Sequence, residues 1–186
     1  MMDVNINVKK ICQEKLLFNP GLAKYRNIMQ QVDVLDVSTD ARFQKTFNGF
    51  YRIRRNELWR RAYYEYFEKV KCGAPTYAEI ITHLYEQTGN VEASFSSKML
   101  ATICPEKPIW DHFVLQNLGL RWVTYAPKSQ KLQDAILLYT SIEEWYDEFL
   151  HTDKAREYID VFDEVLPDYT WLSDTKKIDF ILWSNR

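Results

Sequence analysis

The sequence predicts an all-α fold, a bundle of helices in a single domain of 186 residues. Three observations carry this prediction. Apolar residues recur at helical spacing through most of the chain after residue 57. Glycine and proline are few, at five and six residues, which disfavours turn-rich β folds. Aromatic residues make up 15% of the chain, and helix–helix contacts are the natural place for so many large rings.

The individual helices follow from stripes of apolar residues and from capping signals. Residues 1–40 are weakly patterned, with one expected helix over residues 22–31 and a loop through residues 36–40. The clearest stripe covers residues 58–70. Thr76-Tyr-Ala-Glu79 forms a capping box, and the helix that it opens is expected to end near Gly89. Further helices are expected over residues 94–103, 112–118, 132–150 (one helix or two), 153–166 and 174–183.

Several protein classes are disfavoured by composition. The first residues contain no basic segment followed by an apolar core, so they do not resemble a signal peptide, and no apolar run is as long as a membrane span. The three cysteines are odd in number and widely spaced. Cysteines so arranged favour a reducing compartment without disulfides or a thiolate metal site. We therefore expect a cytoplasmic protein that does not contact a membrane.

The net charge of −2 conceals a strong asymmetry along the chain. Residues 42–71 contain nine Lys or Arg against three Glu, a local balance of +6. Residues 132–186 contain five basic and thirteen acidic residues, a balance of −8. A polyanion would therefore be attracted to the first region and repelled by the second.

Residues 76–120 follow a characteristic order: helix, tight turn, helix, short loop, then an aspartate at the start of a third helix. The segment contains Thr88-Gly-Asn-Val-Glu-Ala-Ser-Phe-Ser-Ser-Lys-Met-Leu100 and then Pro108-Ile-Trp-Asp-His-Phe-Val114. It resembles the helix-hairpin-helix DNA glycosylase superfamily, and within it the archaeal and bacterial 8-oxoguanine DNA glycosylases most closely. It is also similar to a bacterial family of uncharacterised proteins with the pattern SFSSKML followed by P-I-W-D-x-x-V. The resemblance covers roughly 45 of the 186 residues.

The resemblance implies a DNA-binding site and a catalytic carboxylate. Backbone N–H groups at the hairpin would hold a DNA phosphate, which assigns this contact to four residues: Gly89, Asn90, Val91 and Ser94. Asp111 would lie near the sugar of a flipped nucleotide and stabilise the positive charge that develops as the N-glycosidic bond breaks. A lysine amine, for which Lys98 is the candidate, would attack the sugar carbon and form a Schiff base.

The segment departs from the family pattern at two positions. Val91 lies where the family has the second glycine of its hairpin, and a side chain there would crowd a phosphate. The family's lysine aligns near Ser94, whereas Lys98 lies one helical turn later and away from the apolar face of its helix. We therefore expect Lys98 to point towards solvent or a partner lobe. A monofunctional glycosylase needs only the carboxylate, so Asp111 is the residue on which activity depends.

Each candidate also has a structural interpretation. Asp111 follows Pro-Ile-Trp and precedes a helix, so helix capping alone accounts for it. Three arginines, Arg52, Arg54 and Arg55, could bind DNA phosphates, or could pair instead with the acidic C-terminal third. The three histidines have no spacing typical of a metal site, and no phosphate-binding or dinucleotide motif is present. The sequence therefore indicates no metal or other cofactor.

Two functional hypotheses follow. The first is a DNA-binding protein with a glycosylase-like fold that removes a damaged base through Asp111. The second is a non-catalytic module of the same fold that binds nucleic acid or a protein partner. Both expect two lobes around the hairpin, one formed by residues 42–120 and the other by residues 1–41 together with 121–186.

Overall fold

A computed structural model describes residues 6–122 and 125–185. Within these residues the chain forms helices and no strand, so the all-α prediction is confirmed. The elements in chain order are α1 (Val8–Ile11), the π-helix η1 (Cys12–Leu16), α2 (Pro20–Gln31), α3 (Ala41–Tyr51), α4 (Glu57–Val70), α5 (Tyr77–Thr88), α6 (Ala93–Ile103), α7 (His112–Asn117), α8 (Lys128–Leu150), α9 (Asp153–Val165), the 3₁₀ turn η2 (Pro167–Tyr169) and α10 (Asp174–Ser184). No helix in this part of the chain is both long and apolar enough to cross a membrane.

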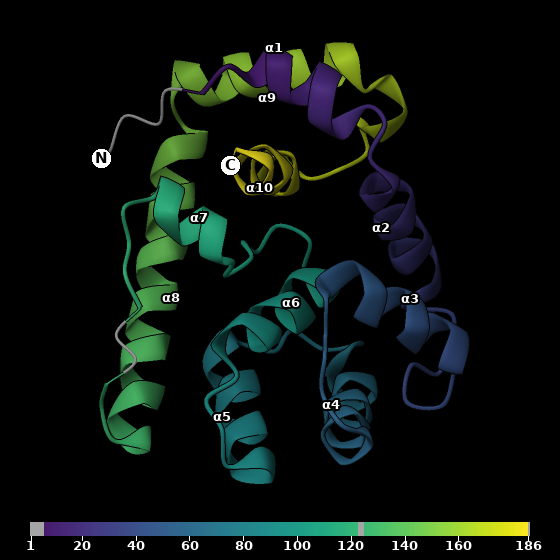
Figure 1. The fold of residues 1–186 in the computed structure, drawn as a ribbon, viewed down its shortest axis with the longest axis vertical. Helices are drawn as coiled ribbons and strands as arrows, with labels where there is room; N and C mark the ends of the chain where they lie inside the picture. Colours follow the sequence, from purple (N-terminus) through teal and green to yellow (C-terminus); the bar gives the residue numbers. More distant parts are fainter. Residues whose placement is uncertain (1–5, 123–124, 186) are drawn as a thin grey trace.

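The helices surround a central region formed by α6, α7 and α10 (Figure 1). At the top of the view, α1 lies beside α9 although they are far apart in sequence, and α10 lies below them. The long helix α8 forms one side of the molecule and packs against α5, which in turn packs against α6. α7 packs against α10. The division into the two lobes given above stays a prediction.

The local signals of the sequence produce the expected helix starts. The capping box of α5 is formed, with Thr76 N donating to Glu79 Oε2 at 2.7 Å and Glu79 N donating to Thr76 Oγ1 at 3.2 Å. Gly89 ends α5 with a positive φ of 67°, a conformation that glycine adopts without the penalty of a Cβ. Residues 128–150 form one helix, α8, which settles the choice between one helix and two.

Besides the short 3₁₀ turn η2, two helical segments in the part of the chain that the structure describes lie outside the predicted ranges. One is the N-terminal pair α1 and η1, whose Cys12 and Leu16 are buried. The other is α3, which is capped by Asp40 and buries Phe43 and Phe47 in an aromatic cluster. α3 is important for the site because its last residues line the pocket described below.

Candidate functional site

A pocket lies where the central helices meet. It is lined by residues of α2, the end of α3, α6, the link before α7, α7 itself and α10. Its cavity volume is about 80 Å³. Ligand pockets in proteins enclose roughly 300–1,000 Å³, so this cavity is smaller than a typical small-molecule site. Lys98, Asp111 and Arg52, three of the residues predicted from the sequence to act in the site, all line it.

Lys98 is buried, so of the two orientations expected for it, towards solvent or towards a partner lobe, the first is wrong. Its side chain is 8% exposed on α6, and its Nζ donates a hydrogen bond to Ser94 Oγ at 2.9 Å. Nζ also lies 5.2 Å from the ring centroid of Phe95 and 5.9 Å from that of Tyr51. The expectation of exposure to solvent was wrong because α6 is central and is covered on more than its apolar face.

The amine of Lys98 has an electrostatic environment suited to nucleophilic chemistry. Burial away from water lowers the pKa of Lys98 below its ordinary value, because the charged form loses its hydration. The negative charge of Asp111 opposes this effect, and the positive charge of Arg52 adds to it. A lowered pKa increases the share of neutral amine, which is the form that attacks carbon.

Asp111 both caps a helix and lines the pocket. Its Oδ1 accepts a hydrogen bond from Phe113 N at 3.0 Å at the start of α7, as the capping interpretation expects. The residue is half-buried, and Oδ2 has no hydrogen-bond partner within residues 6–122 and 125–185. One oxygen therefore holds the helix while the other is available to a ligand.

Two serines of α6 fix the position of Asp111 relative to Lys98. Ser94 Oγ donates to the backbone carbonyl of Trp110 at 2.8 Å, and Trp110 N donates to Ser97 Oγ at 2.9 Å. Both polar backbone groups of the residue before Asp111 are thus bound to the helix that carries Lys98. Ser94 was predicted to contact a phosphate through its backbone N–H, and its hydroxyl contacts the Trp110 carbonyl and the lysine amine.

The three predicted arginines occupy different environments. Arg52 is exposed, has a positive φ of 55° at the end of α3, and lies 6.0 Å from the ring of Trp183. Arg54 is also exposed. Arg55 forms a 2.7 Å ion pair with the buried Glu92 at the start of α6. The partner of Arg55 is therefore in the link between α5 and α6 and not in the acidic C-terminal third.

The link between α5 and α6 holds the other predicted phosphate-binding residues. Gly89 and Asn90 are exposed and Val91 is half-buried. Lys128 Nζ donates to the carbonyl of Gly89 at 2.6 Å. The carboxylate of Glu92 also accepts a hydrogen bond from Trp59 Nε1 at 3.0 Å, so a negative charge lies at the first turn of α6.

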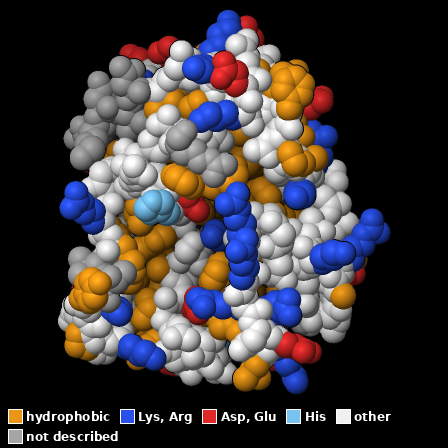
Figure 2. Space-filling view, in the orientation of Figure 1, with side chains coloured by type: hydrophobic (Ala, Val, Ile, Leu, Met, Phe, Trp, Pro, Cys, Tyr) orange, Lys and Arg blue, Asp and Glu red, His pale blue; other side chains and the backbone are white. Residues whose placement is uncertain are grey.

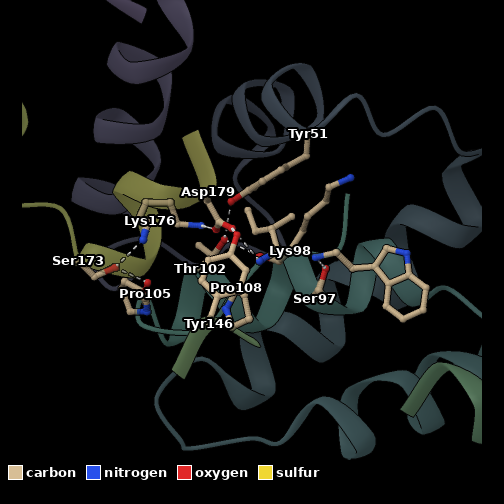
Figure 3. Close-up of polar contacts among 12 residues, drawn as sticks. Tyr51, Ser97, Lys98, Thr102, Pro105, Pro108, Tyr146, Ser173, Lys176 and Asp179 are labelled. Atoms are coloured by element: carbon tan, nitrogen blue, oxygen red, sulfur yellow. Dashed lines mark hydrogen bonds and ion pairs between the residues drawn. The ribbon is translucent and has the colours of Figure 1, made fainter. Parts of the chain in front are cut away.

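A buried polar cluster on the α10 side of the pocket was not found from the sequence. Asp179 Oδ2 accepts from Lys176 Nζ at 2.9 Å, and Oδ1 accepts from Tyr146 Oη at 2.6 Å and from Ile109 N at 3.3 Å (Figure 3). Burial is the main cause that raises the pKa of Asp179, and the Lys176 ammonium opposes it. Lys176 and Asp179 are one turn apart on α10, but only the tertiary packing places them at a pocket.

Aromatic rings form much of the remaining wall of the pocket. They come from three helices and comprise Tyr25, Phe50, Tyr51, Phe180 and Trp183. Tyr25 and Phe180 make an edge-to-face contact with centroids 5.7 Å apart. A pocket with aromatic walls and a few charged groups favours a flat ligand with polar atoms at its edge.

Comparison with known protein families, with curated proteins and with solved structures found no match to this chain.

Proposed function

We propose that this chain binds DNA and removes a damaged base, with Asp111 and Lys98 as the reacting groups in the pocket. The observation that carries the proposal is the placement of a half-buried carboxylate and a buried amine of lowered pKa in one pocket with Arg52 at its edge. Residues with perturbed pKa values in a pocket are candidates for catalysis. The resemblance of residues 76–120 to DNA glycosylases supports the same assignment.

The chemistry follows from the two groups. As the N-glycosidic bond breaks, its electron pair leaves with the base, and the sugar acquires positive charge that the Asp111 carboxylate stabilises. In a hydrolytic reaction, water then adds to C1′ and gives up a proton. In a lyase reaction, the neutral amine of Lys98 forms a bond to C1′ instead and loses a proton to solvent. The C1′–O4′ bond then breaks, O4′ takes up a proton, and a protonated imine joins Nζ and C1′.

Exposed cations would hold the DNA backbone near the pocket. Lys and Arg side chains gather across the middle of the face shown in Figure 2. Arg52 and Arg54 are exposed, so both are available for phosphate contacts. A hairpin contact through Gly89, Asn90, Val91 and Ser94 remains part of the proposal, although Glu92 places a carboxylate beside it.

The test is base release from duplexes that carry 8-oxoguanine and a panel of other lesions. We expect release by the wild type and loss of at least about a hundredfold in Asp111→Asn, because the charge opposite the developing cation is removed. Asp153→Asn, which changes an exposed carboxylate, serves as the matched control. Borohydride should trap the wild type on DNA only if Lys98 forms an imine, and Lys98→Gln should abolish the trapped species.

The enzyme proposal is refuted by equal base release from the wild type and Asp111→Asn, or by no release from any lesion.

The second candidate function is a non-catalytic binding module. It is favoured by the carboxylate of Glu92 at the hairpin and by the hydrogen bond from Lys128 to the Gly89 carbonyl. Such a module would bind either nucleic acid or a protein partner. The affinity for an undamaged DNA duplex, measured at increasing salt concentration, distinguishes these two possibilities. Phosphate contact weakens steeply with ionic strength, whereas binding that is absent or insensitive to salt indicates a protein partner.

A further inference from the structure

The amine of Lys98 has few partners for its charged form. Its Nζ donates one hydrogen bond, to the neutral hydroxyl of Ser94, and forms no ion pair in the part of the chain that the structure describes. An ammonium group has three N–H donors, so two of them have no acceptor there. Burial lowers the pKa of Lys98 for the same reason. A buried lysine with so little compensation for its charge is suited to react as a neutral amine.

The cavity that Lys98 lines is small. Its volume is about 80 Å³, and apolar side chains such as Phe50, Val114 and Phe180 form much of its wall. An apolar cavity of roughly 150 Å³ holds one benzene molecule, so a cavity of about half that size holds roughly three or four non-hydrogen atoms. A nucleobase is larger than this. The DNA reaction proposed above would therefore have to reach Lys98 from the opening, and the cavity itself fits a much smaller molecule.

Two further groups of the lining indicate that the occupant is partly polar. Tyr25 is 1% exposed, and its hydroxyl has no hydrogen-bond partner among the described residues. Buried hydroxyl groups are almost always hydrogen-bonded, so this one is expected to meet a polar atom inside the cavity. Asp111 lines the same cavity with one carboxylate oxygen that no described residue binds. A small, partly polar molecule beside a neutral amine has the properties of a simple carbonyl compound.

We propose that the cavity is a covalent binding site for a small aldehyde or ketone, which the amine of Lys98 captures as an imine. Nζ forms a bond to the carbonyl carbon, and the carbonyl oxygen takes up the proton that the nitrogen loses. The C–O bond of this adduct then breaks with uptake of a second proton, water leaves, and a protonated imine remains. The carboxylate of Asp111 is the group at the cavity that can carry these protons. This activity needs no DNA, so it goes beyond the proposed function.

Acetaldehyde tests the proposal on the full chain in the presence of cyanoborohydride, which reduces an imine to a stable secondary amine. Peptide mass spectrometry then measures the rate of ethylation at each lysine near neutral pH. Lys45, which is exposed on α3, serves as the reference within the same molecule. We expect Lys98 to be ethylated at least about fivefold faster than Lys45, because burial increases its share of neutral amine.

Three controls separate a built site from a lysine that is merely reactive. Benzaldehyde exceeds the size of the cavity, so with this reagent Lys98 should react more slowly than Lys45. In urea the chain unfolds and both lysines meet solvent, so the advantage of Lys98 with acetaldehyde should disappear. In Lys98→Met the rapid ethylation should be lost, while the rate at Lys45 stays that of the wild type.

Two outcomes overturn the site: ethylation of Lys98 no faster than that of Lys45, or a preference for Lys98 that is as strong with benzaldehyde as with acetaldehyde. Both are separable from failure of the proposed function. If a damaged base is released while Lys98 shows no advantage with acetaldehyde, the carbonyl site fails and base excision stands. If Lys98 captures acetaldehyde selectively and no lesion is released, the carbonyl site stands and base excision fails.

Discussion

Replacement of Lys176 by methionine should destabilise the fold strongly, because it leaves a buried carboxyl without its countercharge. Lys176 is 1% exposed and Asp179 is 4% exposed, and their 2.9 Å ion pair lies within the helix α10. Methionine conserves much of the volume of the lysine stem. The main effect of Lys176→Met is therefore electrostatic and does not arise from a cavity.

The magnitude follows from the burial of the pair. Loss of one partner from a buried ion pair costs about 3–5 kcal/mol. For a chain of this length, each kcal/mol lowers Tm by roughly 2–4 °C, so Lys176→Met should lower Tm by roughly 6–20 °C. Asp179 keeps two hydrogen-bond donors in the variant, Tyr146 and the backbone N–H of Ile109. Because they still stabilise its charge, we expect the loss of stability at the lower end of the range of about 3–5 kcal/mol.

The destabilisation by Lys176→Met should depend on pH, because Asp179 titrates. Burial holds the pKa of Asp179 in the folded protein above its ordinary value, so its contribution favours folding at low pH and is lost as pH rises through the folded pKa. Removal of the Lys176 charge raises that pKa further. The destabilisation by Lys176→Met should therefore be largest at neutral pH and should shrink as pH falls towards 4.

Urea unfolding followed by circular dichroism, at neutral and acidic pH, measures this effect. The double variant Lys176→Met/Asp179→Asn removes both charges and should be more stable than Lys176→Met at neutral pH. Lys107→Met is the control, because it breaks a half-exposed ion pair with Glu143 worth at most about 1 kcal/mol. The reasoning is refuted if Lys176→Met unfolds within 1 kcal/mol of the wild type at neutral pH.

Three further predictions concern the reacting groups and the fold. Asp111→Asn should lower the pKa of Lys98 further, because the charge that raises it is removed, and the ¹³Cε signal of Lys98 followed against pH measures this. Ser94→Ala should lower the same pKa by removing the hydrogen bond to Nζ, whereas Ser96→Ala, which affects only a bond to the helix backbone, should leave it unchanged; equal titration of both variants contradicts this. Thr76→Ala should cost about 1 kcal/mol of unfolding free energy in urea melts, because the capping box is lost; no change would contradict the capping role.

The parts of the fold that carry local signals could be predicted from the sequence. The start of α5 is an example, since the side chains of Thr76 and Glu79 bond to backbone groups within the same turn. α3 carries local signals of the same kind, with Asp40 as its cap and Phe43 and Phe47 at helical spacing, so this helix is also predictable from the sequence.

The environment of Lys98 could not be predicted from its helix alone. Helical periodicity places it off the apolar face of α6, and such a position is usually solvated. α6 is instead covered on several sides, and polar residues such as Ser96 and Thr102 are buried with Lys98. A run of small polar residues on an apolar helix is a signal of such a central helix. Tyr25 contacts α10, which lies about 150 residues away in the sequence. A contact between such distant segments depends on tertiary packing and leaves no local signal in a single sequence.

The burial of Lys98 is hard to explain by stability. Its nearest hydrogen-bond partner is the neutral hydroxyl of Ser94, and the charge of Asp111 does not offset the loss of hydration, since the pKa of Lys98 is lowered on balance. A lysine whose pKa is lower in the folded than in the unfolded chain destabilises the fold at neutral pH. Lys98→Met should therefore unfold at the same or a higher temperature, while losing any imine that borohydride traps. A large fall in Tm instead would mean that Lys98 is a structural residue, and its lowered pKa would then be no argument for catalysis.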